Sequence, residues 1–163
     1  MTRWGLGRLA IAALVVIGLA GLACRRSPEA PPAVTTPAPL ALPDALDGFA
    51  AAPLVRGAGF VRRTYARGTT LVDVTLARAP LGPGGFDGWV TMSQAFPQAT
   101  LDAPAADANG FYQCTEHPSP SCDLLITLRS GVHVEIRGGG TSSRADVDAI
   151  ARALPLRALA APP

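Results

Sequence analysis

Two stretches in the last third of the chain, 122–129 and 132–137, alternate between apolar and polar residues, and this pattern constrains the fold most. A period of two is typical of a β-strand with one buried and one solvated face. The residues Arg129-Ser130-Gly131 between the stretches predict a tight turn. With a third strand expected at 110–114, the pattern predicts an antiparallel sheet. The apolar set is Leu124, Ile126, Leu128, Val132, Val134 and Ile136.

An earlier hairpin is expected within residues 60–78. Val72, Val74 and Leu76 alternate with polar or small residues there, which is again the period of a half-buried strand. The pair Arg67-Gly68 supplies the turn to the preceding strand. A further weak strand is expected near 48–55.

Two helices are expected as well. Within 85–95 one apolar face recurs at helical spacing, and Pro97 bounds this helix. The second helix begins after Ser142 or Ser143, either of which can cap it, and Asp146 near its first turn suits the helix dipole. Pro155 ends it. The apolar faces are Phe86, Trp89, Val90 and Phe96 in the first helix, and Val147, Ile150, Ala151 and Leu154 in the second.

The order of these elements predicts the α+β class, with a single twisted antiparallel sheet of about five to six strands and two helices packed on one face. This order is loosely similar to that of small periplasmic or lumenal domains of the PsbP and Mog1 type. The similarity concerns element order alone. It therefore implies a fold and no function.

The N-terminal residues form a separate unit. Residues 9–23 are uncharged and mostly aliphatic, Arg3 and Arg8 precede them, and Cys24 follows. This is the anatomy of a signal peptide, which we place at 1–23. Because a cysteine stands directly after the small residue Ala23, the segment resembles a bacterial lipoprotein signal. It departs from that family's pattern at Gly21, where the family has Leu.

The resemblance implies that the sulfur of Cys24 carries a lipid and attaches the protein to a membrane of the bacterial cell envelope, facing the periplasm. Arg25 stands where inner-membrane lipoproteins carry a retaining aspartate, which favours the outer membrane. Two alternatives remain open. Ordinary cleavage would release a soluble secreted protein. An uncleaved anchor would need roughly 20 apolar residues, more than this run provides.

Residues 24–43 are expected to form the lipidated cysteine and a tether. Six prolines lie within 25–43, and such a stretch favours extended polyproline II at about 3.1 Å per residue. We expect the globular domain at 44–160. Its remaining cysteines, Cys114 and Cys122, predict a disulfide in an oxidising compartment. A metal site with His117 is the alternative, but it would lack a fourth ligand.

The sequence offers one weak candidate for a polar site: His133, Glu135 and Arg137, which the alternating pattern places on one face of the last strand. The interpretation as a solvated ladder of opposite charges competes with that of a small polar surface site. The downstream P-C-x-x-C of zinc deaminases is missing. The chain contains no lysine and therefore no nucleotide-binding G-x-x-x-x-G-K-[ST].

These observations favour a non-enzymatic envelope protein that binds another envelope component, with no catalytic residues, cofactor or metal. Removing Arg3 and Arg8 leaves the mature chain formally neutral, so nucleic acid is not expected as a partner. One alternative is a carrier of a small ligand, with a pocket between the sheet and the Phe86–Phe96 helix. Another is an enzyme that uses His133, Glu135 and Arg137.

Overall fold

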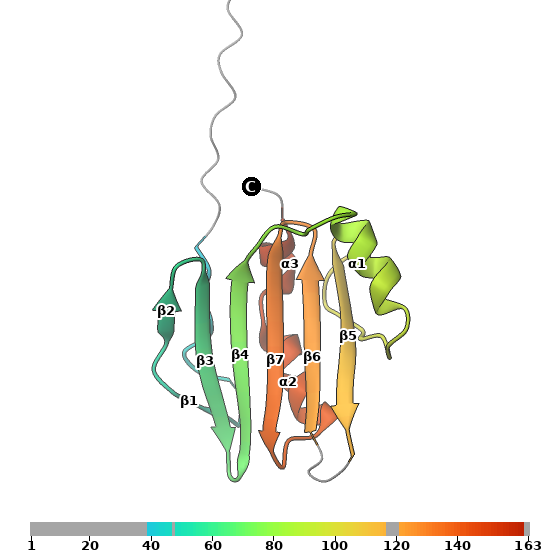
Figure 1. The fold of residues 1–163 in the computed structure, drawn as a ribbon. Helices are drawn as coiled ribbons and strands as arrows, with labels where there is room; N and C mark the ends of the chain where they lie inside the picture. Colours follow the sequence, from blue (N-terminus) through green and yellow to red (C-terminus); the bar gives the residue numbers. More distant parts are fainter. Residues whose placement is uncertain (1–38, 47, 117–120, 162–163) are drawn as a thin grey trace, which may run out of the picture. The chain divides into compact units, whose positions relative to one another are not determined.

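A computed structural model describes residues 39–46, 48–116 and 121–161. Within them, one antiparallel sheet has the strand order β1-β3-β4-β7-β6-β5, and β2 also pairs with β3 (Figure 1). The antiparallel sheet with helices is the expected α+β arrangement. The strands are β1 (Ala50–Ala51), β2 (Val55–Gly57), β3 (Phe60–Arg67), β4 (Thr70–Arg78), β5 (Ala108–Thr115), β6 (Ser121–Leu128) and β7 (Val132–Gly140).

The two predicted hairpin regions join through the last strand of each, β4 and β7. β4 pairs with β7 along its whole length, so that Asp73 lies opposite Arg137 and Val74 opposite Ile136. The turns at both hairpin ends require left-handed backbone, which Gly68 and Gly131 provide with φ of 60° and 80°. The sheet therefore combines β3–β4 with β5–β6–β7 into one surface.

The sheet has seven strands, somewhat more than the five to six expected. The difference lies at the edge, where the weak strand near 48–55 is divided into β1 and β2. Pro53 lies between them and has no N–H to donate to β3. The N–H of Ala52 still donates to the carbonyl of Thr64 at 2.9 Å, so both pieces follow the same side of β3.

There are three helices in the described residues rather than two: α1 (Gly85–Ser93), α2 (Arg144–Ala153) and α3 (Leu156–Ala160). Pro155 ends α2 as predicted, but a short third helix follows because Leu156 and Leu159 bury their side chains in the core. Ser143 caps α2, and Asp146 closes the capping box. The helix α1 ends at Ser93, two residues before the expected end.

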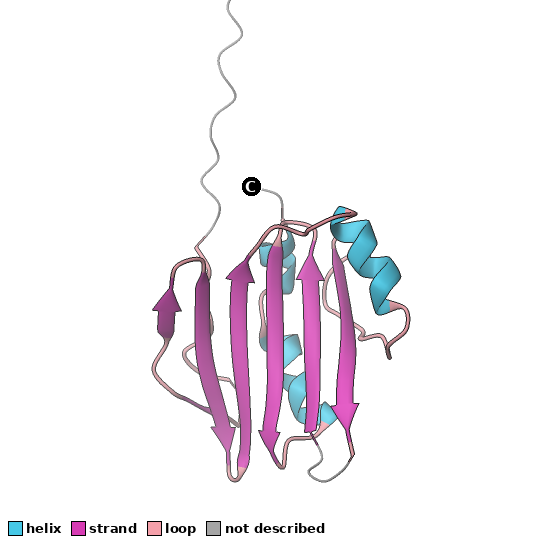
Figure 2. Ribbon diagram, in the orientation of Figure 1, coloured by secondary structure: helices cyan, strands magenta, loops and turns pink. Residues whose placement is uncertain are grey.

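The helices are divided between the two faces of the sheet, which corrects the expectation of a single covered face. α2 and α3 lie behind the sheet in Figures 1 and 2, while α1 lies beside β5. Trp89 of α1 contacts His133, with ring centroids 5.5 Å apart. Since His133 alternates with the buried Val132 and Val134, α1 covers a corner of the opposite face.

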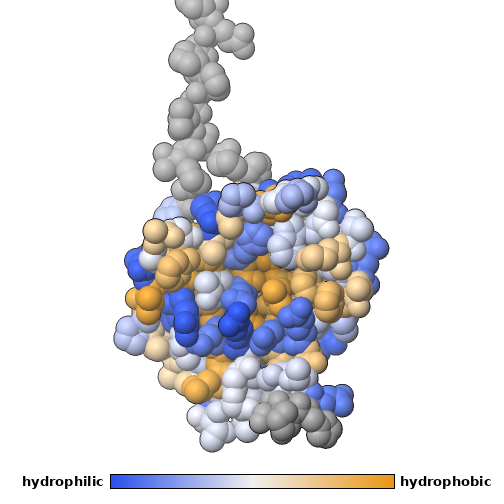
Figure 3. Space-filling model, in the orientation of Figure 1, coloured by the Kyte–Doolittle hydropathy of each residue, from blue (hydrophilic) through white to orange (hydrophobic). Residues whose placement is uncertain are grey.

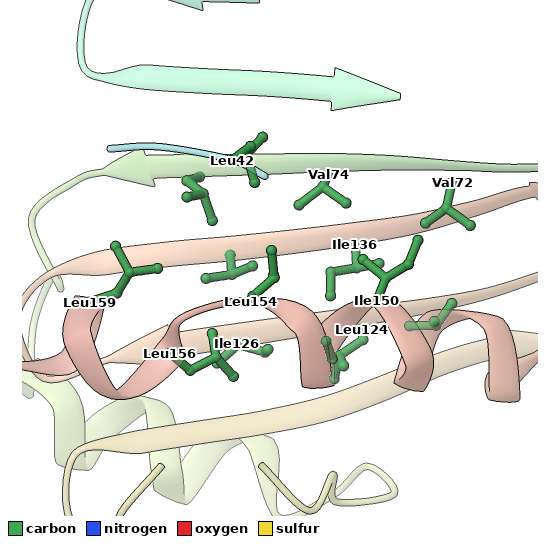
Figure 4. Close-up of a cluster of buried hydrophobic side chains, with 14 of the residues drawn as sticks. Leu42, Val72, Val74, Leu124, Ile126, Ile136, Ile150, Leu154, Leu156 and Leu159 are labelled. Carbon is green, nitrogen blue, oxygen red and sulfur yellow. The ribbon is translucent and has the colours of Figure 1, made fainter. Parts of the chain in front are cut away.

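The core lies between the sheet and the helices α2 and α3 (Figure 4). Alternate residues of the central strands enter it, as the period of two predicts. Burying each such side chain contributes about 1.5–3 kcal/mol relative to leaving it exposed. The side chains with at most 1% exposure include Val72, Val74, Leu76, Leu124, Ile126, Leu128, Val132, Val134, Ile136, Ile150 and Leu156.

The packed part of the chain begins earlier than the expected boundary at residue 44. Leu40 and Leu42, which lie among the prolines, are 9% and 6% exposed and belong to the core. The carbonyl of Pro43 accepts hydrogen bonds from Arg63 Nη1 at 2.6 Å and from Tyr65 Oη at 2.8 Å. Side chains of β3 thus hold this segment against the sheet.

The expected signal peptide and Cys24, like most of the proline-rich stretch, lie outside the described residues. Of the helices that the structure describes, none combines the length and the apolar character needed to cross a bilayer.

Candidate functional site

The face of the sheet opposite α2 and α3, called the open face below, carries the polar side chains that the sequence singles out. The strand β7 presents His133, Glu135 and Arg137 there at alternate positions. The register places Asp73 of β4 and Asp123 of β6 on either side of Arg137. Figure 3 views this face, where a band of hydrophilic residues runs beside an apolar area.

Glu135 and Arg137 form an ion pair along one strand. Arg137 Nη2 lies 2.6 Å from Glu135 Oε1, and Arg137 Nε donates to the same oxygen at 2.7 Å. The hydrogen bond with Glu135 raises the pKa of Arg137. The side chain of Arg137 is 64% exposed, and ion pairs at such exposure contribute about 0–1 kcal/mol. The pair therefore contributes little to the stability of the fold and mainly sets the charge pattern of this surface.

The two flanking aspartates are held differently. Asp73 accepts from Arg62 Nη2 at 3.0 Å and from Thr64 Oγ1. Asp123 Oδ1 accepts from the N–H of Gly138 at 3.1 Å. Burial raises the pKa of Asp123, and the Gly138 hydrogen bond and the charge of Arg137 oppose this rise. Acidic and basic groups thus alternate across three strands.

His133 has surroundings of a different kind. Its Nδ1 lies 3.3 Å from Thr127 Oγ1, and the Trp89 ring packs against its imidazole. Burial lowers the pKa of His133, against a smaller raising effect of the Ala79 carbonyl. The imidazole is therefore neutral at neutral pH. The structure places all three residues on one face but does not bring His133 into the Glu135–Arg137 ion pair.

Cys114 and Cys122 lie directly opposite each other on β5 and β6, with their sulfur atoms at a bonding distance of 1.96 Å. The predicted pairing is thereby confirmed. Two sulfurs bonded to each other cannot also bind a metal as thiolates, so the pairing disfavours the alternative site with His117. That histidine lies outside the described residues.

A pocket of about 380 Å³ lies between α1, the segment 98–105 and β5. The carrier alternative expects a pocket between the sheet and the Phe86–Phe96 helix, but neither Phe86 nor Phe96 lines this pocket. Phe96 follows α1 and stacks on Phe111 at 4.9 Å. Sequence reasoning missed the residues of 98–110 that line the pocket, because alanine-rich loops carry no periodicity. Their small size is the signal that could have indicated a space.

Comparison of the chain with models of protein families, with curated proteins and with solved structures finds no match.

Proposed function

We propose that this protein is exported, is attached to a membrane of the bacterial cell envelope by a lipid on Cys24, and binds another envelope component through the open face. In this proposal the domain is a binding module and not an enzyme. The proline-rich sequence ahead of Pro39 would serve as the tether that keeps the domain clear of the bilayer, since such sequences favour an extended chain of about 3.1 Å per residue.

Two observations support the location. The basic start, the apolar run 9–23 and the adjacent Cys24 have the order of a lipoprotein signal. Independently, Cys114 and Cys122 lie at bonding distance on neighbouring strands. Disulfides persist in oxidising compartments such as the periplasm and are rare in the bacterial cytosol.

The observation that carries the binding role is the contrast between the two faces of the sheet. The core fills the face under α2 and α3. On the open face, the charged residues Asp73, Arg137 and Asp123 follow one another in register across three strands. Charges arranged in this way give specificity toward a partner of complementary pattern.

Metabolic labelling with an acyl-chain probe tests the anchor. We expect label on the wild-type protein and loss of label in Cys24→Ala, because the sulfur is the point of attachment. Wild-type protein without label contradicts the anchor. In that case an intact mass that begins after a cleaved signal peptide would favour the soluble secreted alternative.

A photo-reactive side chain at Thr75 tests the binding face, since Thr75 lies opposite Glu135 on the open face. The matched control carries the same group at Ala158, an exposed position of α3. We expect cross-links to an envelope component from position 75, fewer from position 158, and a loss of those from position 75 in Arg137→Glu. Equal cross-linking from both positions, or no effect of Arg137→Glu in a stably folded protein, would contradict the role.

A further inference from the structure

We propose that a second pocket, at the outer edge of β5 beside Arg144, binds a small aromatic carboxylate whose carboxyl group pairs with the Arg144 guanidinium. This inference goes beyond the proposed function, which uses the charged residues of the open face and does not depend on this pocket.

The pocket lies next to a short pairing at the edge of the sheet. Gln98 and Phe111 form an isolated bridge there, and the N–H of Tyr112 donates to the carbonyl of Pro97 at 2.9 Å. The adjoining space measures about 310 Å³, at the small end of the range of about 300–1,000 Å³ for ligand pockets. It therefore suits a molecule of one ring. Its lining consists of Phe96, Pro97, Tyr112, Gln113, Cys114 and Arg144.

One wall of the pocket offers an apolar ring surface. Phe96 is 38% exposed, and its ring stacks on that of Phe111 with centroids 4.9 Å apart. The N–H of Phe96 donates to the carbonyl of Ser93 at 2.9 Å. Because these contacts hold the Phe96 ring before any ligand binds, an aromatic ligand can pack against it without first ordering the wall.

The Arg144 guanidinium is oriented by an aromatic ring. Its central carbon lies 3.8 Å from the centre of the Tyr112 ring, and the Tyr112 hydroxyl donates to Asp148 Oδ1. Stacking uses the flat face of a guanidinium, whereas its N–H groups point outward in the plane, where they can donate two parallel hydrogen bonds to a carboxylate. Since Arg144 is exposed, a ligand from solvent can reach these donors.

The charge of the ligand follows from the charge of the lining. Arg144 is the charged side chain among the residues of this pocket. Each ion pair that the described residues form uses a different arginine, and Asp148 accepts from Tyr112 instead. The positive charge at the pocket therefore has no carboxylate partner within the described part of the chain, and an anionic ligand supplies one.

Phenylacetate and phenylacetamide test the proposal, because they have nearly the same shape and differ in charge. Equilibrium dialysis at pH 7 measures their binding to the full chain in phosphatidylcholine nanodiscs, with empty nanodiscs as the blank. We expect saturable binding of phenylacetate about tenfold tighter than that of phenylacetamide, because hydrogen bonds to a charged group are the stronger ones. No saturable binding of phenylacetate, or equal affinities for the two, would overturn the proposal.

An arginine variant locates the carboxyl group. Arg144→Gln should bring phenylacetate to the affinity of phenylacetamide. The matched control is Arg152→Gln, which removes an exposed arginine of the same helix that does not line this pocket, and it should keep the tenfold preference. An equal loss in both variants would show a general effect of surface charge and refute the assignment.

A second variant locates the ring. Phe96→Ala should weaken both probes by about fivefold and leave their ratio unchanged, because it removes apolar contact and no charge. Met92→Ala removes another exposed apolar side chain, at 51% exposure and outside the pocket, and should change neither affinity. Unchanged binding in Phe96→Ala would place the ligand elsewhere and refute the assignment. Circular dichroism checks the fold of each variant, and Phe96→Leu or Arg144→Met replaces one that unfolds.

Discussion

Arg67, the last residue of β3, forms an ion pair with Asp146 in the first turn of α2. The two residues are 79 positions apart in sequence. The guanidinium carbon of Arg67 also lies 4.5 Å from the centre of the Phe49 ring. Asp146 Oδ2 accepts from the N–H of Ser143 at 2.8 Å. One cluster thus connects the N-terminal segment, the sheet edge and the start of the C-terminal helix.

Replacing Asp146 by Asn should lower the free energy of unfolding by about 1–2 kcal/mol, since the change weakens the capping box and removes the partner of Arg67. Urea unfolding at neutral pH measures this loss. Asp87→Asn, in the first turn of α1, is the control, because its carboxylate also pairs with an arginine but is 83% exposed and makes no cap hydrogen bond. A loss below about 0.5 kcal/mol, the usual scatter of surface substitutions, would show that the cluster does not stabilise the fold.

The contribution of Asp146 should depend on pH. The hydrogen bond from the Ser143 backbone lowers the pKa of Asp146 most, and Arg67 lowers it further. A carboxyl with a depressed folded pKa stabilises the fold above its unfolded pKa of about 3.9 and loses this effect as the pH falls through the folded value. The stability difference between wild type and Asp146→Asn should therefore shrink in urea titrations below about pH 4. A constant difference down to pH 2 would contradict this.

His133 should make the protein less stable in mild acid. Burial lowers its pKa in the fold below the ordinary value of 6.5, so the unfolded chain takes up the proton first. Stability should fall as the pH drops from 6.5 toward the folded pKa. Thermal unfolding between pH 7 and pH 5, followed by Trp89 fluorescence, measures this. We expect a flatter profile in His133→Gln and an unchanged one in His117→Gln. The reverse pattern would assign the dependence to His117.

The cross-strand cysteines should stabilise the domain chiefly by restricting the unfolded chain. Closing the short loop 114–122 corresponds to about 2.5 kcal/mol in the chain-entropy model. The double replacement of Cys114 and Cys122 by Ala should lower the free energy of unfolding by about this amount. Urea unfolding with and without reductant provides the check, because reductant should bring the wild type down to the double variant and leave the variant unchanged.

The leucines next to the prolines should matter for folding as well. Leu42→Ala is expected to cost about 2 kcal/mol, at the low end for buried leucines, because Leu42 lies at the margin of the core. A chain that begins at residue 44 should be less stable than one that begins at residue 39. The shorter chain lacks Leu42 and the Pro43 carbonyl that accepts hydrogen bonds from Arg63 and Tyr65. Equal unfolding midpoints for the two truncated chains would show that this segment adds nothing.

The strands could be read from the sequence because their signal is local. Val132, Val134 and Ile136 alternate with His133 and Glu135, and such a pattern holds whatever the strand pairs with. Prediction is weaker where a single residue changes the secondary structure. Pro53 divides an edge strand, and the few apolar residues after Pro155 form a helix only because the core accepts Leu156. The pocket beside α1 was not predicted, since most of its lining comes from a loop without periodicity and the small size of those side chains is the only local signal.

By itself the sequence determined the class of fold, the buried side of β4, β6 and β7, a serine cap for α2 and the cysteine pair, because these depend on spacing and on residue chemistry within short windows. Tertiary structure alone decided that β4 lies beside β7, that α1 covers the open face at His133, that Leu40 and Leu42 enter the core, and that the segment 98–105 forms a pocket with β5. These features arise from many weak contacts between distant segments, and no short window of sequence contains their sum.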